Sequence, residues 1–566
     1  MFLKGRLLAL SLLTLSLSQA QQSSLYPPQE VLARIRPESI RAQMEFLSDD
    51  LLEGRATGSR GFLLAAKYVA AQFKEMGLQP AGTNGSYFQN LRFRSIQLQS
   101  DHSSVVLKRD GAEERLVIAQ DYLAEGNPLH EDAQVEAPVV FVGYGVTAPE
   151  EHYDDYAGVD VKGKIVAMIY GAPANFPVAE AAHYSSRVNK AKNAAARGAV
   201  GIISIWAGSR EKKSPFSRLV RSYGHLRMRW LDDNGNPGES QPEIRATVGL
   251  SKTAAEKMFA GAQKSFSDAL AYTESGKPQA FPLAVTVSIH LVSKFTEVES
   301  PNIAALLPGS DPQLRNEYVL FTAHGDHLGI GNPVNGDSIY NGAIDNASGT
   351  AAVLEIARAL ASLPTPPRRS FLFLVVTGEE EGLQGSDAYA HHPTVPISQI
   401  VADVNMDEIG MFYDFRDFVP QGADHSSIGA VVADVARHMD LEISPDPEPE
   451  EVFFVRSDQY SFVKQGIPAV AVDSGHKAVD PKLDGRRITY DWEQTYYHSP
   501  QDDMNQPYLD LNAAAKCARL NLAIAYEIAQ QTERPRWNPG DFFERFARQS
   551  VIPSASNNNP PAVPAP

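Results

Sequence analysis

Cysteine is almost absent from this chain. Its 566 residues contain a single cysteine, Cys517, so an internal disulfide is excluded, and a metal site built on several thiolates is excluded as well. The fold must therefore be held together by packed apolar cores. A hydrophobic share of 43% beside 21% charged residues is typical of a globular protein. A chain of this length is expected to form at least two domains.

Basic residues are outnumbered by acidic ones. There are 51 lysines and arginines against 68 aspartates and glutamates, which gives a formal net charge of -17 at pH 7. Because nucleic acids and anionic lipid surfaces repel such a chain, neither is expected as a partner. The acidity suits solubility or the binding of cations.

Long apolar runs are also missing, apart from one at the start of the chain. Lys4 and Arg6 precede an apolar run from Leu7 to Leu17, and small residues follow up to Ala20. This order predicts a secretory signal peptide over residues 1–20. The alternative is a membrane anchor, but the run is shorter than the ~20 residues needed to span a bilayer. We expect export to the periplasm or the extracellular space, without stable membrane insertion after cleavage.

The rest of the chain shows two textures. From residue 139 to about residue 261, short β-rich runs alternate with alanine-rich segments, which indicates a small α/β unit. The second half then alternates apolar strands with amphipathic helices, as in residues 317–324, 346–363 and 369–378. This pattern predicts an α/β fold with a mostly parallel central sheet flanked by helices. Residues 552–566, rich in Asn and Pro, are expected to form a disordered tail.

Histidines and carboxylates follow the predicted strands, and ligands bind at the carboxyl ends of such strands. The candidates are His324, Asp326 and His327, then Asp345, then Glu379, Glu380 and Glu381, then Asp407, and finally His498. Imidazoles and carboxylates without thiolates suit zinc or a similar divalent ion, and this many acids suit two ions. Asp345 alone also fits a simple helix cap.

Five ordered motifs carry a family resemblance. The stretches "AHGDH", "NGAIDNASG", "TGEEEGLQGS", "NMDEIG" and "YYHSPQDD" resemble the M28 metallopeptidases, which include co-catalytic zinc aminopeptidases and glutamate carboxypeptidase relatives. The resemblance implies a zinc-exopeptidase-like catalytic domain made of residues 22–130 and 285–545. Residues 131–284, with "VVFVGYGV" and "DYAGVDVKGKIV", resemble an inserted protease-associated (PA) domain.

The resemblance also implies roles for single residues. Two Zn2+ ions would be held by His324, Asp345, Glu380, Asp407 and His498. Asp345 would bridge the ions, His324 and Glu380 would each lie on the ion opposite Asp407, and His498 would share an ion with Asp407. Glu379 matches the general base, and Asp326 matches the acid that holds the tautomer of His324. His327 matches no ligand position and is interpreted as a lining or packing residue.

The function implied by this resemblance is an exported dizinc exopeptidase, an aminopeptidase that releases N-terminal residues from peptides with accessible termini. A metal-bridging hydroxide would attack the peptide bond, with Glu379 as general base. Two alternatives stay open, a glutamate-carboxypeptidase-like enzyme and an inactive binding or receptor-like protein on the same fold. Ile344 stands where many aminopeptidase members have a second Asp, which bears on substrate choice.

Two further residues are weak candidates for substrate binding. Arg456 is suited to a substrate carboxylate, although an ion pair between Arg456 and Asp458 is the alternative interpretation. The other histidines considered are interpreted as surface or packing residues without partners: His391, His392, His425 and His438.

Overall fold

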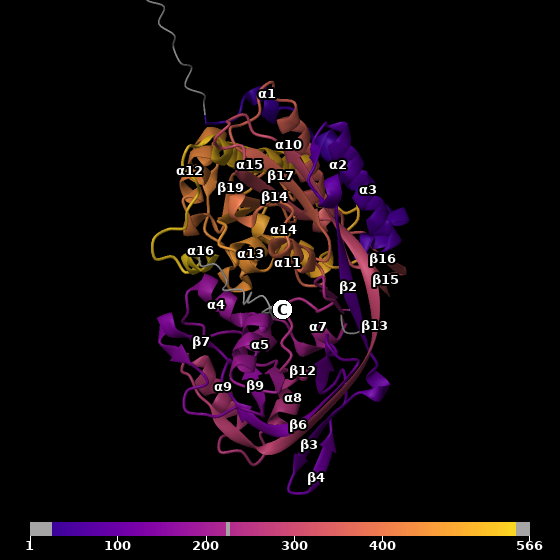
Figure 1. The fold of residues 1–566 in the computed structure, drawn as a ribbon, viewed down its shortest axis with the longest axis vertical. Coiled ribbons are helices and arrows are strands. Elements are labelled where there is room, and N and C mark those ends of the chain that lie inside the picture. The colour runs from indigo at the N-terminus through magenta and orange to yellow at the C-terminus, as the bar shows by residue number, and fades with distance from the viewer. Residues whose placement is uncertain (1–24, 222–226, 551–566) are drawn as a thin grey trace, which may run out of the picture.

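Two sheets divide the molecule, and one long strand, β13 (Phe281–Leu307), belongs to both. The computed structural model describes residues 25–221 and 227–550, so the predicted signal peptide and the predicted tail lie outside the described residues. In Figure 1 the strand runs along one side of the molecule and joins an upper lobe to a lower inserted lobe. The upper lobe contains the central sheet and is called the catalytic lobe after the expectation stated above. Its first part pairs with strands of the insert, and the part from Ser293 onward pairs with the central sheet.

The central sheet has parallel strands in its middle and antiparallel strands at its flanks. In order across the sheet, its strands are β11 (Arg227–Trp230), β2 (Phe88–Leu98), β13, β17 (Ser370–Val376), β14 (Tyr318–His324), β18 (Ile400–Asn405), β21 (Ala469–Ser474), β19 (Asp417–Gln421) and β20 (Glu442–Ile443). The four strands from β17 to β21 run parallel to one another. This confirms the predicted mostly parallel central sheet flanked by helices.

Strand β17 is buried on both faces, because helices cover both sides of the sheet. Phe371 and Phe373 belong to the larger core, beside the helices α1 (Gln29–Leu32), α2 (Pro37–Leu47), α3 (Arg60–Glu75), α10 (Gly349–Ala361), α12 (Ile428–Met439) and α15 (Leu511–Gln530). Leu372 and Leu374 face the other way, toward α11 (Gln384–His391) and α13 (Gln459–Val463). A strand covered on both faces reads as a continuous apolar run, as this one does. Among the described residues, no helix has the length and hydropathy to cross a membrane.

The inserted lobe has its own sheet and core. Its strands, in order, are β4 (Ala112–Arg115), β3 (Ser104–Arg109), β13, β6 (Asp132–Phe141), β9 (Ile165–Ile169), β10 (Gly201–Ile205), β12 (Ala246–Leu250) and β5 (Tyr122–Ala124). Its helices are α4 (Val178–Ser185), α5 (Arg187–Ala196), α6 (Gly208–Lys213), α7 (Phe216–Arg221), α8 (Lys252–Met258) and α9 (Phe266–Glu274). The parallel strands β6, β9, β10 and β12 form its centre.

The lobes do not divide at residues 131 and 284. Strands β3, β4 and β5 fall within the predicted catalytic range 22–130 but pair with the insert. Conversely, β11 falls within the predicted insert but pairs with β2 of the central sheet. The sequence texture marks the apolar strands from β6 onward, whereas these short, partly polar strands carry no such signal.

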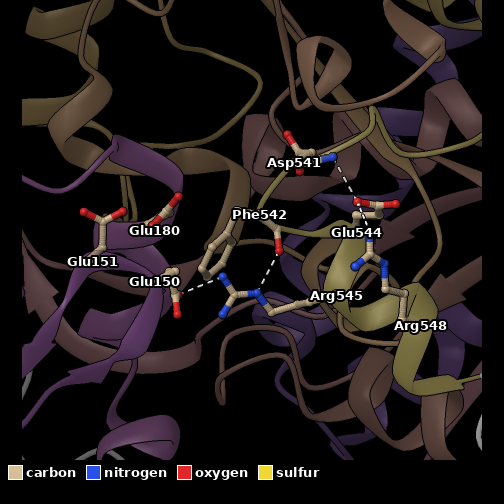
Figure 2. A pocket seen from close by; sticks show the side chains of 9 residues that line it. Glu150, Glu151, Glu180, Asp541, Phe542, Glu544, Arg545 and Arg548 are labelled. Carbon is tan, nitrogen blue, oxygen red and sulfur yellow. Dashed lines mark hydrogen bonds and ion pairs between the residues drawn. The ribbon is translucent and has the colours of Figure 1, made fainter.

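The C-terminal segment, residues 533–550, connects the two lobes. Trp537, Phe542 and Phe543 pack against Phe454 of the catalytic lobe, and the segment ends in α16 (Glu544–Ser550). Figure 2 shows Arg545 reaching Glu150 of the insert, with 2.7 Å between Nη2 and Oε1. These contacts border a cavity of about 250 Å³ that is rich in charged side chains. The segment therefore fastens the insert against the catalytic lobe.

Candidate metal centre

The predicted ligands meet at the carboxyl edge of the central sheet. His324 is the last residue of β14, Glu379 and Glu380 follow β17, and Asp407 follows β18. Asp345 lies in the turn Ala343–Ser348 that precedes α10. Because these strands are parallel neighbours, their ends bring the side chains to one place. His498 arrives from the loop after α14 (Gly485–Thr495).

A first group of ligands surrounds His324. Its Nε2 lies 3.3 Å from Asp345 Oδ1 and 3.1 Å from Asp407 Oδ1. Atoms at this separation can all bind one ion, since zinc bonds to nitrogen and oxygen are about 2.0–2.2 Å long. The three residues therefore form one candidate metal group.

A second group surrounds His498. Its Nε2 lies 3.2 Å from Asp345 Oδ2 and 3.3 Å from Glu380 Oε2. Asp345 thus turns one oxygen toward each group, and its side chain does not cap α10. Asp407 lies with His324 and Glu380 lies with His498, so the predicted pairing of His498 with Asp407 is wrong. The reason is the sheet order, because β14 and β18 are direct neighbours.

His327 lies closer to the centre than the sequence suggested. Its Nδ1 is 2.7 Å from Glu380 Oε1 and 3.7 Å from Asp345 Oδ2, and its side chain is fully buried. The Nε2 of His327 has no hydrogen-bond partner among the described residues, and the close contact of Nδ1 with Glu380 Oε1 does not have hydrogen-bond geometry. Buried polar atoms without partners are costly unless a cation or proton binds them. The donor set of imidazoles and carboxylates therefore fits a pair of divalent ions, with His327 as an additional candidate ligand.

The charges of the centre shift its acids in opposite directions. Burial raises the pKa of Asp345, but the charge of His327 and hydrogen bonds from His324 and His498 outweigh it and hold this pKa well below its usual range. Burial raises the pKa of Glu379 well above its usual range, with the charges of Glu380, Asp407 and Asp458 adding to this effect and His324 opposing it.

Glu379 and Glu381 have different surroundings. Glu379 offers a carboxylate oxygen within 4.8 Å of ligand atoms of His324 and Glu380. Glu381 turns away, and its Oε2 accepts a hydrogen bond from the backbone N–H of Met228 at 3.2 Å. Since Met228 lies on β11, Glu381 connects the candidate centre to the segment contributed by the insert.

Asp326 supports the centre in a way that differs from the expectation. His324 Nδ1 donates to the backbone carbonyl of Asp326 at 3.1 Å, so the tautomer is held by the main chain and not by the carboxylate. The carboxylate of Asp326 instead accepts hydrogen bonds from Thr57 Oγ1 at 2.9 Å and from the backbone N–H of Glu379 at 3.3 Å. Asp326 therefore positions the backbone of the predicted base.

Arg55 is a supporting residue that the sequence did not reveal. Its side chain is 1% exposed, and it donates to the carbonyls of Gly325, Asn341 and Gly342 at 3.0, 2.6 and 3.0 Å. The preceding residue, Gly54, has φ of 67°, and a Cβ there would lie 2.4 Å from the carbonyl oxygen of Tyr340. Only glycine fits so close an approach. The glycines around Arg55 in the stretch "EGRATGSRG" are the sequence feature that could have indicated this close backbone approach.

Two more supporting residues hold the ligand loops. Ser457 Oγ donates to Asp407 Oδ2 at 2.6 Å, which orients this ligand. The fully buried Asp502 accepts hydrogen bonds from the backbone N–H groups of Ile344 and Asp345. The sequence alone does not indicate which of the adjacent residues Asp502 and Asp503 supports the ligand loop.

The two weak candidates for substrate binding, Arg456 and Asp458, do not contact each other and have different surroundings. Arg456 Nη1 lies 3.3 Å from Glu451 Oε2, and its guanidinium stacks over the ring of Phe453. The alternative ion pair between Arg456 and Asp458 is not formed. Asp458 is 0% exposed, and burial raises its pKa to about 7. It therefore has no surface to offer to a substrate in this structure.

Three histidines interpreted as lacking partners have them. His391 Nδ1 lies 2.8 Å from the backbone carbonyl of Asp387. His425 Nδ1 lies 2.7 Å from Asp541 Oδ2 of the C-terminal segment. His438 Nδ1 lies 3.0 Å from the backbone carbonyl of Asp434. The contact between His425 and Asp541 joins residues that are far apart in the sequence. The contact between His438 and Asp434 lies within one turn of α12.

The geometry agrees with a comparison of this chain with known families. Residues 302–525 match the model of Peptidase family M28. This stretch of the chain is therefore similar to that family. Every candidate metal ligand and Glu379 fall within the M28 segment, whereas the insert lies outside it.

Known proteins match part of this chain. Leucine aminopeptidase 2 of Arthroderma otae is 25% identical over 266 residues, which cover 45% of this chain and 49% of that protein. The probable leucine aminopeptidase 2 of Aspergillus oryzae is 28% identical over 286 residues, covering 47% and 52%. The chain thus spans about half the length of the curated relatives it matches.

A solved structure extends the similarity to the fold. The aminopeptidase from Aneurinibacillus sp. strain AM-1 aligns with 90% of this chain and 100% of its own, at 21% sequence identity and a TM-score of 0.51. At this level of identity the likeness concerns the fold, which is that of an aminopeptidase-like α/β sheet.

Proposed function

We propose that this protein is an exported two-metal exopeptidase that releases N-terminal residues from peptides. One observation carries the proposal: Asp345 turns one carboxylate oxygen toward each of two ligand groups, with the Glu379 carboxylate beside them. The leucine aminopeptidase names of the matched relatives support the choice of reaction. The basic and apolar start of the chain supports export.

We assign the ligands to two metal ions from the distances between their side-chain atoms. His324, Asp407 and one oxygen of Asp345 would hold one zinc ion, and His498, Glu380 and the other oxygen of Asp345 would hold the second. Such a pair supplies positive charge that lowers the pKa of water from 15.7 toward about 7 and polarises a peptide carbonyl.

Glu379 would serve as the proton carrier. Its carboxylate is within 4.8 Å of ligand atoms of His324 and Glu380, and Asp326 holds its backbone N–H. In this position Glu379 takes a proton from the attacking water and delivers it to the nitrogen of the leaving amine. A general base and acid of this kind contributes about 10²–10⁴ in rate.

The acidic surroundings favour the N-terminus of a peptide over the C-terminus. Burial raises the pKa of Glu408 well above its usual range, and the charges of Asp345 and Asp407 add to this shift, so Glu408 lies within the same acidic group. An excess of carboxylates attracts a substrate ammonium and repels a terminal carboxylate. Arg456, the candidate for binding a carboxylate, is paired with Glu451.

The test compares three variants of the full-length protein on aminoacyl p-nitroanilides. We expect Glu379→Gln to keep its bound metal by mass analysis and to lose at least ~10²-fold in kcat. Asp345→Asn is expected to lose metal and activity together. Glu381→Gln is the matched control, because the neighbouring Glu381 faces β11 and is expected to leave kcat nearly unchanged. Full turnover by Glu379→Gln would refute the role of this residue.

A second substrate comparison tests which end is cleaved. Peptides with a free α-amine are expected to be hydrolysed, and their N-acetylated counterparts are expected to be inert. Cleavage of N-acetylated peptides with release of the C-terminal residue would instead establish a carboxypeptidase. Absence of any hydrolysis with two bound metals per chain would favour a binding protein on this fold.

A further inference from the structure

A second, separate group of possible metal ligands lies on helices α12 and α15, which contribute no residue to the candidate metal centre. Asp434 and His438 lie four residues apart on α12, so both face the same side of that helix. Glu527 lies on α15, which packs against it. Each of the three side chains offers a ligand atom, and these atoms all lie within 4.8 Å of one another.

Glu527 is the unusual member of the group. It is 1% exposed, and its neighbours on α15, such as Ile524 and Ile528, are apolar core residues. Its Oε1 has no hydrogen-bond partner among the described residues. The cation whose charge acts on it, Arg437, is itself paired with Asp434. A buried carboxylate oxygen without a hydrogen bond is costly unless a proton or a cation binds it.

The proximity of Asp434 adds to the cost of burying the charged carboxylate of Glu527. Burial raises the pKa of Glu527 to about 7, and the charge of Asp434 and a hydrogen bond with Asp434 add to the shift. Above neutral pH the two carboxylates repel each other, since only Arg437 offsets their charge. A divalent cation between them would remove the repulsion and complete the bonding of Glu527 Oε1.

His438 supplies the nitrogen ligand. Its Nδ1 lies 3.5 Å from Asp434 Oδ2 and 3.0 Å from the backbone carbonyl of Asp434, a hydrogen bond that an ion on Nδ1 would have to replace. The ring stacks on that of Tyr26 with 4.4 Å between the ring centres. The side chains of His438 and Asp434 are 47% and 36% exposed, so an ion reaches them from solvent and water completes its coordination. Two ligands on one tetrahedral zinc ion lie about 3.4 Å apart, so the exposed side chains of Asp434 and His438 would close in by up to about 1.4 Å on binding.

We propose that Asp434, His438 and Glu527 bind one divalent ion of the zinc type. One imidazole with two carboxylates is a donor set for zinc and similar transition metals, and it is poorer in oxygen than calcium prefers. The ion would cross-link α12 to α15 and hold the ring of Tyr26 against α12. Its role is structural, because no candidate catalytic residue lies on either helix.

The experiment titrates zinc alone into full-length protein whose tightest metal sites are already filled. By calorimetry and by metal analysis after equilibrium dialysis, the wild type is expected to bind one more zinc ion per chain than His438→Gln or Glu527→Gln. We expect these variants to weaken this additional site at least tenfold. Equal zinc content and affinity in the wild type and in His438→Gln would overturn the proposal.

His391→Gln is the matched control. His391 and Asp387 also lie four residues apart on one helix, with 3.6 Å between Nδ1 and Oδ2, but Asp387 is already paired with Lys464. This variant is expected to bind as much zinc as the wild type. Asp345→Asn separates the two sites, because it is expected to lose metal from the candidate centre and to keep the ion at His438.

Thermal unfolding gives an independent readout. Zinc is expected to raise the Tm of Asp345→Asn and to leave the Tm of a double variant, Asp345→Asn with Glu527→Gln, unchanged. In a metal-free buffer at pH 8, Glu527→Gln is expected to be no less stable than the wild type, since it removes a buried charge. If zinc raises the Tm of both variants equally, Glu527 is simply a protonated core residue and the proposal fails.

Discussion

Asp502 holds the loop that carries Asp345 by two adjacent backbone groups. Its Oδ2 accepts a hydrogen bond from the backbone N–H of Asp345 at 3.0 Å, and its Oδ1 accepts one from Ile344 at 2.9 Å. Gln506 donates to the same Oδ1 at 2.7 Å. Every donor around Asp502 is an N–H group, so the site requires a residue that only accepts hydrogen bonds. Asp502 thereby fixes the one side chain shared by both ligand groups.

The first prediction concerns Asp502→Asn. The amide would turn N–H donors toward the N–H donors of Asp345 or Gln506, so the turn at Asp345 must shift. Residues that orient metal ligands typically contribute about 10–100-fold to metal affinity or activity. We expect a loss of that size in zinc affinity, measured by competition with a chelator. Asp503→Asn is the control, because the carboxylate of Asp503 accepts its hydrogen bonds from Asn505 within the same loop. Equal affinities in both variants would contradict this role.

Arg55 provides the second prediction. Its planar guanidinium donates to the carbonyls of Leu47, Gly325, Asn341 and Gly342 from a buried position. A lysine at this site has one compact ammonium group and cannot reach all four acceptors. With about 1 kcal/mol for each lost hydrogen bond, Arg55→Lys is expected to lower the free energy of unfolding by roughly 2–3 kcal/mol.

Urea unfolding measures this loss, with Arg60→Lys as the comparison. Arg60 is exposed at the start of α3, so its replacement is expected to change stability by less than about 0.5 kcal/mol. If Arg55→Lys is as stable as Arg60→Lys, the four carbonyls are satisfied without the guanidinium.

The central sheet was predictable from the sequence because its strands are buried on both faces. Phe371 to Val376 form an apolar run that only a covered strand or a core helix explains, and a turn with Gly378 follows at once. The place of strand β3 in the insert was not predictable, because its partner lies on β13, more than 170 residues away. Pairing over such distances leaves no local pattern to recognise.

The candidate centre was predictable for residues that follow strands directly, such as His324 and Asp407. The grouping of these ligands was not, because it depends on β14 and β18 being neighbours in the sheet. The role of His327 was missed for a related reason, since only the fold brings its ring to Glu380. Residues that act through backbone groups, such as Asp502, carry no chemical signature in the sequence.

Trp230 gives the third prediction, on the contact between the lobes. Its backbone N–H donates to Gln384 Oε1 at 3.0 Å, and its Nε1 donates to Asp387 Oδ2 at 2.9 Å. Trp230→Ala removes a side chain that is 6% exposed, and losses of this kind cost about 3–5 kcal/mol. We expect β11 to come loose from the catalytic lobe and to become sensitive to limited proteolysis.

Trp206→Ala is the matched control for this change. Trp206 is also nearly buried, at 8% exposure, and its Nε1 donates to Ser214 within the insert at 2.7 Å. Its loss is expected to destabilise the insert and to leave cleavage near β11 unchanged. The same cleavage pattern in both variants would mean that Trp230 does not anchor β11 to the catalytic lobe.

The last prediction is a pH dependence at the C-terminal segment. Burial lowers the pKa of His425, but the hydrogen bond and charge of Asp541 and the charge of Asp424 outweigh it, so this pKa is raised above 6.5. A raised pKa means that the folded state binds the proton more tightly than the unfolded state. The stabilisation is therefore fully present below pH ~6.5 and is lost as the pH rises through the folded-state pKa of His425.

Asp541→Asn removes the charged partner and isolates this contribution. The wild type is expected to be more stable than Asp541→Asn at pH 6, by on the order of 1–2 kcal/mol for a hydrogen bond to a charged group. The difference is expected to shrink toward pH 9, where His425 is neutral in both proteins. Thermal unfolding at a series of pH values measures it, with His102→Gln, at an exposed histidine, as the control. A difference that grows with pH would reverse the sign and show that Asp541 acts on another group.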